Sequence, residues 1–411
     1  MIKRFIGTFR EYPGTFWTLI GALFIDRVGG ALIFPFLALY LTSKFSISMT
    51  EVGVLFAIIS ICSFFGSMIG GALTDKFGRR KLMIFGLISS AASMLIIGLA
   101  NDMRAIYIAS VLVGLLSDIG HPATQAMVAD ILPEAKRLDG FGVLRVVANL
   151  AVTIGPAVGG LIASKSFVYL FIIDAVASTL TALIVLFILP ETKPEVNEGQ
   201  KAPSILQTFK GYGVALRDGI FMLFLAVTAI STLVYMQMNS TLSVYLRDFH
   251  AIDTRHFGYI ISMNALMVVV FQFWVTRKIS KYQPMLLMTV GTLLYAIGFA
   301  AYGFVGTYVL FLAAMVIITI GEMIVSPTSS ALVARLAPAD MRGRYMAVTG
   351  FSWIIPSMIG PLAAGLVMDN LNPDWVWYAC GILGLIATLG FFILYKASSS
   401  RLSKTQTTEE V

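Results

Sequence analysis

The sequence carries little charge for its length. Of its 411 residues, 12% are charged and 58% are hydrophobic, whereas soluble domains carry roughly 25% charged residues. Such a chain has too little polar surface to face water, which excludes a soluble globular fold. Apolar runs of about 20 residues, the length of a helix that crosses a bilayer, recur from one end to the other. The sequence therefore predicts a polytopic membrane protein.

Cysteine and histidine are also scarce. The two cysteines, Cys62 and Cys380, both lie in apolar runs, and there are 3 histidines. This excludes a disulfide framework and Cys-based metal sites. An enzyme would need a nucleophile with a base, or a metal cluster, and the sequence offers no such group of residues. ATP-driven transport would need a P-loop, and no P-loop motif occurs in the sequence. We expect no enzymatic activity, no metal and no cofactor.

The basic residues lie in short clusters between the apolar runs. A net charge of +7 could indicate nucleic acid as a partner, but membrane orientation explains the clusters better. Most of the 29 Lys and Arg residues fall in alternate loops, and loops rich in these residues stay in the cytosol. The pattern predicts a multi-pass protein with both termini cytosolic and no nucleic-acid partner.

Only helices or closed barrels satisfy their backbone groups in hydrocarbon, and runs this continuously apolar are helical. We expect an all-α protein with twelve transmembrane helices in two pseudo-symmetric six-helix bundles. The predicted helices lie near residues 15–41, 51–73, 82–100, 105–131, 141–163, 167–190, 220–246, 256–276, 284–304, 308–334, 343–368 and 375–395.

The two bundles are predicted from an internal duplication. A shift of 205 residues superposes Tyr40 on Tyr245, and the same shift matches Pro122 to Pro327 without a gap. Parallel six-helix repeats with a ligand site between them are a transporter architecture. The predicted parts are an N-terminal bundle, a cytosolic linker, a C-terminal bundle and a cytosolic tail, at residues 1–190, 191–219, 220–395 and 396–411.

The turn after the second predicted helix carries a dense motif, GALTDKFGRRK at residues 71–81. Gly71 would permit close helix approach and Gly78 a tight turn, while Asp75 can interact with neighbouring basic groups or a helix N-terminus. The stretch closely resembles motif A of the major facilitator superfamily. The residues that carry this resemblance are Gly71, Asp75, Lys76, Gly78, Arg79 and Arg80.

In that family, motif A latches the cytosolic ends of the two halves in the outward-open state. An acid at the end of the fourth helix joins the latch, and Asp130 occupies that position here. The alternative is an exposed turn that serves only as a basic anchor at the cytosolic surface.

A second motif lies in the fifth predicted helix. Gly155, Pro156, Gly159 and Gly160 resemble motif C, which the family associates with antiporters. Pro156 would bend the helix, and the glycines would let another helix approach. Duplicated packing geometry is an equally good explanation. The arginine of motif B is not matched, because its position holds Ser110.

Ionisable residues inside the predicted spans are the candidates for proton coupling. A charge in hydrocarbon costs roughly 2.5–3.5 kcal/mol, so such residues are retained only when paired, hydrated or useful. The candidates are Glu322, Asp26, Asp118 and His121. The alternatives are a permanently protonated packing acid for Glu322, a static pair with Arg145 for Asp26, and an ordinary packing role for His121.

A third group of polar residues is expected to line a substrate cavity. Side chains of this kind suit a cavity that is polar in places. Arg145 is also a candidate to replace the missing motif B arginine. They serve as interhelical hydrogen-bond partners just as often. The candidates are Arg27, Arg145, Asn149, Tyr235, Gln237, Asn239, Asn264 and Gln272.

The resemblance implies a secondary transporter, most similar to the twelve-helix drug:proton antiporters of prokaryotic inner membranes. It would export an amphipathic small molecule by alternating access as protons enter, working as a monomer in the lipid bilayer. The alternatives are a proton symporter that imports a nutrient or metabolite, and an exporter of lipids or sugars. The substrate is not specified by these residues.

Overall fold

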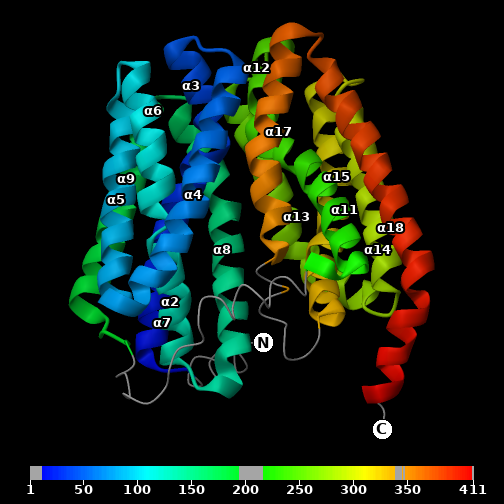
Figure 1. The fold of residues 1–411 in the computed structure, drawn as a ribbon. Coiled ribbons are helices and arrows are strands. Elements are labelled where there is room, and N and C mark those ends of the chain that lie inside the picture. Colours follow the sequence, from blue (N-terminus) through cyan, green and yellow to red (C-terminus); the bar gives the residue numbers. More distant parts are fainter. Residues whose placement is uncertain (1–11, 194–215, 338–344, 346–347, 410–411) are drawn as a thin grey trace. The chain divides into compact units, whose positions relative to one another are not determined.

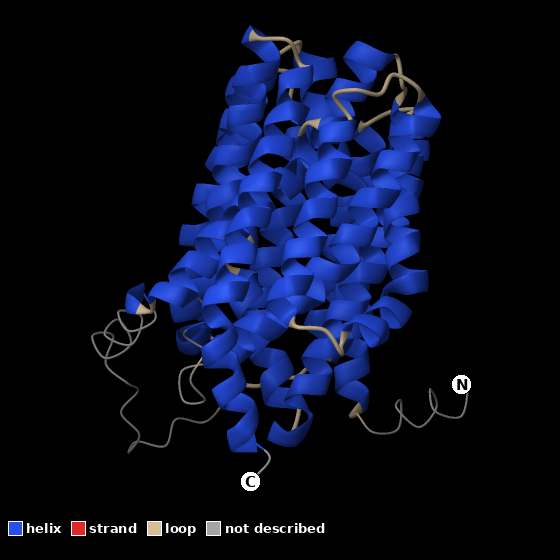
Figure 2. Cartoon of the chain, turned by 90° about the vertical axis from the view of Figure 1, so that its right-hand side faces the viewer, coloured by secondary structure: helices blue, strands red, loops and turns tan. Residues whose placement is uncertain are grey.

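The chain forms helices and short connections throughout the part described by the computed structural model, namely residues 12–193, 216–337, 345 and 348–409 (Figures 1 and 2). Within these residues, 12 helical segments are long and apolar enough to cross a membrane. The prediction of an all-α polytopic membrane protein is confirmed.

The chain divides into two compact units. Unit 1 comprises the described residues within Met1–Ile47, Val54–Glu198 and Ala251–Ala265. Unit 2 comprises those within Ser48–Gly53, Gly199–His250 and Leu266–Val411. Two short segments, Ser48–Gly53 and Ala251–Ala265, group with the opposite half of the sequence.

The helices before the linker lie close to the predicted ranges. Their bounds are α2 Gly14–Ile33, η1 Phe34–Phe36, α3 Leu37–Phe45, α4 Met49–Phe77, α5 Arg79–Leu99, α6 Met103–Leu112, η2 Val113–Ser117, α7 Gly120–Ile131, α8 Glu134–Ala163 and α9 Val168–Ile188.

The helices after the linker follow the predicted ranges less closely. Their bounds are α11 Gly219–Ser240, α12 Leu242–His250, α13 Thr254–Ile279, α14 Pro284–Ala301, α15 Tyr308–Leu336, α17 Phe351–Asn370 and α18 Asp374–Glu409. The last helix continues past residue 395, into the segment expected to be a tail. Residues 338–344, where we expected the eleventh span to begin, are outside the described part.

The fourth predicted span, near 105–131, is broken rather than continuous. It consists of α6, a π-helical turn η2 and α7, with Asp118 and Ile119 in a turn between η2 and α7. Pro122 explains the break, because it has no N–H to donate to the carbonyl of Asp118 and its ring would clash with that carbonyl. Instead, the N–H of His121 donates to the Asp118 carbonyl over 3.2 Å.

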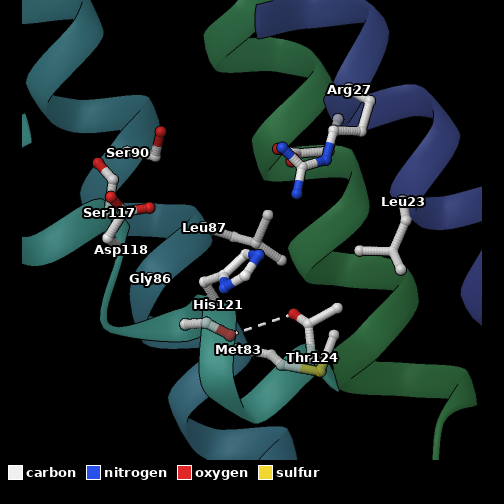
Figure 3. A pocket seen from close by; sticks show the side chains of 12 residues that line it. Leu23, Arg27, Met83, Gly86, Leu87, Ser90, Ser117, Asp118, His121 and Thr124 are labelled. Atoms are coloured by element: carbon white, nitrogen blue, oxygen red, sulfur yellow. Dashed lines mark hydrogen bonds between the residues drawn. The ribbon is translucent and has the colours of Figure 1, made fainter. Parts of the chain in front are cut away.

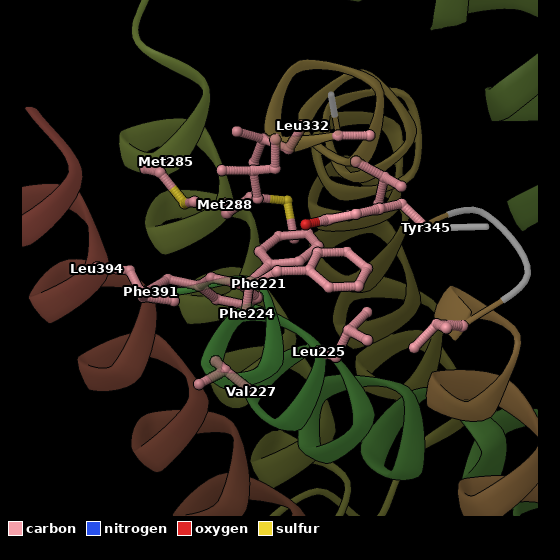
Figure 4. Close-up of a cluster of buried hydrophobic side chains, with 14 of the residues drawn as sticks. Phe221, Phe224, Leu225, Val227, Met285, Met288, Leu332, Tyr345, Phe391 and Leu394 are labelled. Carbon is pink, nitrogen blue, oxygen red and sulfur yellow. The ribbon is translucent and has the colours of Figure 1, made fainter. Parts of the chain in front are cut away.

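Each unit has its own apolar core. In unit 2 (Figure 4), Phe221 packs against Tyr345 with ring centroids 4.4 Å apart, and Phe224 against Phe391 at 6.0 Å. In unit 1, the core gathers around Phe16, which is fully buried. Large apolar side chains such as Phe187 are strongly exposed instead, as expected where a helix meets lipid.

Glycines bring the broken span against its neighbours. A Cβ atom on Gly114 would lie 2.4 Å from the carbonyl oxygen of Ile59 in α4, and one on Gly86 of α5 would lie 2.9 Å from Cα of Gly120. Backbones this close leave no room for a side chain. The position of the broken span therefore depends on these glycines.

Gly114→Ala should lower the Tm of the detergent-purified protein by several degrees, because overpacking a close contact costs about 1–3 kcal/mol. Gly21→Ala is the matched control, since a Cβ on Gly21 would meet nothing within 4 Å; it should leave the Tm unchanged or raise it. Equal Tm values for the two variants would show that the α4 contact does not constrain the span.

Candidate functional site

The break in the fourth span borders a cavity of about 200 Å³ within unit 1. Its walls come from α2, from α5 and from the segment η2–α7. Four of the lining side chains are ionisable, namely Asp26, Arg27, Asp118 and His121. The structure thus brings together three of the predicted proton-coupling residues and one predicted substrate-cavity residue.

The backbone break sets the positions of Asp118 and His121. In an unbroken helix, residues three apart lie on one face, but here Asp118 directly follows the π-turn and His121 is the second residue of the next helix, α7. Figure 3 shows Leu23 and Arg27 of α2 on one side of the cavity, Ser90 and Asp118 on the other, and His121 between them. Both Arg27 and Asp118 interact electrostatically with the imidazole of His121.

Asp26 connects the cavity to α9. Its Oδ1 accepts a 2.7 Å hydrogen bond from the Ser178 hydroxyl, and it also interacts electrostatically with Arg27. The partner of Asp26 is thus Ser178, and not Arg145, which the sequence had offered as a static partner. Neither Arg145 nor Asn149 is among the residues that line this cavity.

The size of the cavity limits what it can hold by itself. Drug-sized ligands occupy pockets of roughly 300–1,000 Å³, and the share of liquid volume per water molecule is about 30 Å³. A cavity of about 200 Å³ suits a few waters, an ion or a small polar solute. It is therefore too small to hold a complete drug-like molecule by itself.

Glu322 occupies a different setting in unit 2. The Tyr235 hydroxyl of α11 donates to Glu322 Oε1 over 2.9 Å. Tyr235 also lies near the rings of Tyr295 and Trp353, with centroids 5.7 Å and 6.4 Å away. Glu322 thus meets Tyr235 directly, and Tyr235 in turn lies near aromatic rings of two further helices.

The other predicted cavity residues of the later helices differ in their contacts. Gln237 is buried and accepts a 2.6 Å hydrogen bond from Thr241. Gln272 of α13 donates to the carbonyl of Met323 in α15 over 2.9 Å. Asn264 is buried, whereas Asn239 is partly exposed. The contact of Gln272 therefore matches the interhelical role that the sequence left open, whereas that of Gln237 stays within one span.

The motif A turn is held by charged contacts inside unit 1. Gly78 has a positive φ of 98°, which other residues rarely adopt. Arg79 Nε lies 2.9 Å from Asp130 Oδ2, so the structure places the acid of the fourth span against this turn. Arg80 donates to the carbonyls of Val185 and Leu186 near the end of α9, where a cation is favourable. The side chain of Asp75 lies outside the described part.

Glu191 belongs to this turn as well, although the sequence did not predict it. Its Oε1 accepts from the backbone N–H of Arg79 over 2.8 Å and so caps α5. Lys193 donates to the carbonyl of Lys76 over 2.9 Å. Its position after the sixth span did not indicate this role, because the helix start that it caps lies more than a hundred residues earlier in the chain.

The glycines of the two motifs differ in how closely they approach other helices. A Cβ on Gly71 would meet nothing within 4 Å, so the expectation of a close helix approach at Gly71 is wrong. The close approach occurs at Gly70, where a Cβ would lie 2.4 Å from the carbonyl oxygen of Ile119. In motif C, Cβ atoms on Gly155 and Gly159 would fall 2.5 Å from Ala31 Cβ and 2.7 Å from the Leu32 carbonyl oxygen.

The rest of motif C also makes packing contacts. Pro156 lies within α8, and a Cβ on Gly160 would lie 3.0 Å from Cα of Gly258, which belongs to the same unit. These contacts favour the packing explanation of motif C.

The loop before α13 contains a local polar pair. The N–H of His256 donates to Asp253 Oδ1 over 2.8 Å, and the two side chains also meet. This backbone hydrogen bond is the main cause that lowers the pKa of Asp253 from its ordinary value. Asp253 therefore serves as a cap for α13. No group of three or more metal-ligating side chains occurs among the described residues.

Comparison with known proteins gives consistent results. The family model described as Major Facilitator Superfamily matches residues 19–358 and 331–411. A "Na(+), Li(+), K(+)/H(+) antiporter" of Planococcus maritimus is 28% identical, over 91% of this chain and 93% of its own. The quinolone resistance protein NorA of Staphylococcus aureus (strain COL) is 22% identical, over 88% and 91%.

Solved structures show the same fold at low identity. The nucleoside transporter NupG superposes with a TM-score of 0.76 at 14% identity, covering 93% of this chain and 100% of its own. A POT family transporter in complex with 5-aminolevulinic acid gives 0.77 at 17% identity, covering 95% and 97%.

Two substitutions of Glu191 should destabilise the protein to different degrees. Glu191→Gln keeps an acceptor oxygen but loses the charge, whereas Glu191→Ala loses both; loss of a cap costs about 1 kcal/mol. We expect the Tm of the purified protein to fall in the order wild type, Gln variant, Ala variant. An alanine variant as stable as the wild type would show that the cap is dispensable.

The cavity should admit water-soluble reagents. In a background carrying Cys62→Ala and Cys380→Ala, His121→Cys should react readily with a charged thiol reagent. Ala123→Cys, whose site is 0% exposed on the same helix, should stay unmodified. Mass spectrometry of the purified variants measures both, and equally slow labelling at the two positions would mean that the cavity is closed to solvent.

Proposed function

The chain belongs to the Major Facilitator Superfamily, and from this membership and the cavity of unit 1 we propose that it is a proton-coupled antiporter. It would export amphipathic organic cations across the bacterial cytoplasmic membrane by alternating access of two six-helix halves. The chain is a multi-pass transporter of small molecules in any case; coupling, direction and substrate are the proposed part.

The observation that carries this proposal is the cavity lined by Asp26, Arg27, Asp118 and His121. Each ionisable group at the centre of a span costs roughly 2.5–3.5 kcal/mol, so a packing role alone does not account for four of them around one open space. Carboxyl and imidazole groups take up and release protons. A proton that crosses the membrane here would supply about 2.3 kcal/mol per 100 mV, in addition to the pH gradient.

Unit 2 supports the choice of substrate class. Glu322 offers a negative charge, Tyr235 donates to it, and the ring of Trp353 lies near that of Tyr235. Carboxylates together with aromatic faces recognise organic cations. One relative is named as an antiporter, which is consistent with antiport. Another is named for quinolone resistance, which is consistent with an organic substrate.

The remaining roles are part of the same proposal. The basic loops favour a cytosolic position for both termini, and the motif A turn with Arg79 and Asp130 would serve on that side as the latch between the halves. The bundles are proposed at residues 1–190 and 220–395, joined by a cytosolic linker, and the functional form is the monomer.

Transport in proteoliposomes tests the coupling. With a pH dye in the lumen and ethidium as the organic cation outside, antiport makes the lumen alkaline as ethidium enters, because protons leave. We expect this signal for the wild type. Acidification of the lumen would contradict antiport and indicate symport. The absence of any proton movement would reject proton coupling for this substrate.

Glu322→Gln and Asp26→Asn should each reduce the proton signal to that of protein-free liposomes, because neither amide takes up a proton in this pH range. The control is Asp102→Asn, which keeps a good cap for α6, where Asp102 accepts from the backbone of Arg104; its signal should equal that of the wild type. An unchanged signal in Glu322→Gln removes Glu322 from the coupling path, and the same holds for Asp26.

A further inference from the structure

Asp174 in α9 is a buried acid that the proposed function does not use. It is 4% exposed, and no side chain or backbone group among the described residues hydrogen-bonds its carboxyl oxygens. The charged group that acts on it is another carboxyl, that of Asp26. Buried carboxyl groups in proteins are normally paired or hydrogen-bonded, so this arrangement needs an explanation.

The contact between α2 and α9 leaves room for Asp174 to face Asp26. Ser178, one turn after Asp174, donates to Asp26 Oδ1 over 2.7 Å. Gly29, one turn after Asp26, has no side chain, and a Cβ there would lie 2.8 Å from Asp174 Oδ1. The two carboxyl groups and the hydroxyl therefore gather at one place between the two helices.

We propose that Asp26, Asp174 and Ser178 form a binding site for a small alkali cation, Na⁺ or Li⁺. Carboxylate and hydroxyl oxygens are hard ligands, which suit hard cations. Asp26 also lines the cavity, whereas Asp174 and Ser178 are not among its lining residues. An ion in the cavity would therefore meet the Asp26 carboxylate first and exchange water for the oxygens of the site there.

Charge favours a monovalent ion. Two carboxylates next to the Arg27 guanidinium, which interacts with Asp26, leave one negative charge without compensation. Ca²⁺ needs about 6–8 oxygen ligands, and Mg²⁺ keeps several waters in a near-octahedral shell. A narrow contact between two helices offers neither the ligands nor the space, so one alkali ion balances the charge of the site.

Binding of radioactive Na⁺ to the detergent-purified full chain tests the proposal directly. The assay uses alkaline buffer with choline chloride to hold the ionic strength constant. We expect saturable binding that unlabelled Li⁺ displaces and choline does not. Asp174→Asn and Ser178→Ala should each weaken binding at least about tenfold, since even indirect partners of a metal site contribute 10–100-fold.

Thr181→Val is the matched control. The Thr181 hydroxyl donates to the carbonyl of Ala22 over 2.9 Å across the same α2–α9 contact, but it is outside the proposed site; this variant should bind Na⁺ like the wild type. Wild-type protein without saturable Na⁺ binding overturns the proposal, as does undiminished binding in the Asp174 variant. If that variant does not fold, undiminished binding in Ser178→Ala overturns the proposal equally.

This site does not depend on the proposed function. Proton movement driven by ethidium in sodium-free choline buffer tests antiport separately, in the same protein. Loss of Na⁺ binding with intact antiport, or the reverse, identifies which of the two proposals fails.

Discussion

A helix in hydrocarbon has to satisfy its backbone hydrogen bonds within itself, and the fourth span does not do so between Ser117 and Gly120. Such a break is tolerated only where protein or a water-filled space covers the freed groups. Here α4 and α5 cover it, because Gly70 and Gly86 allow the backbones to touch. The turn this creates places Asp118 and His121 at the cavity. The candidate site of unit 1 therefore exists only because the span is interrupted.

The two copies of the duplicated sequence use the same proline differently. Pro122 and Pro327 are equivalent under the internal repeat, yet α15 continues through Pro327. The acid of that span, Glu322, lies one position before the equivalent of Asp118 and accepts a hydrogen bond from a tyrosine. A shared ancestral backbone thus carries two different arrangements of ionisable groups, one open to a cavity in unit 1 and one beside aromatic rings in unit 2.

Length and hydropathy predicted the spans well, because the cost of exposing polar backbone to lipid is reflected in local composition. The contacts of the sites were much less accessible. In a membrane protein, the lipid-facing and interior faces of a helix are both apolar, so the sequence does not fix how each helix is rotated. This is why the close contact was expected at Gly71 and occurs at Gly70, and why Asp174 was not linked with Asp26.

Some of the missed features did leave a local signal. Gly-His-Pro at residues 120–122 combines a weak helix former with a residue that cannot donate, which favours a break. The capping role of Glu191 depends on a helix start more than a hundred residues earlier in the chain, and no pattern within the sixth span could indicate it.

The contacts of Glu191 and Lys193 also determine where the chain can be lengthened. Both residues are tied to the α4–α5 turn through Arg79 and Lys76, so the first residues after α9 are fixed in register with that turn. Extra residues placed before Lys193 would pull the carboxylate away from the start of α5. Natural variation in length, or a fused reporter domain, belongs after Lys193, where the spacing to this turn no longer matters.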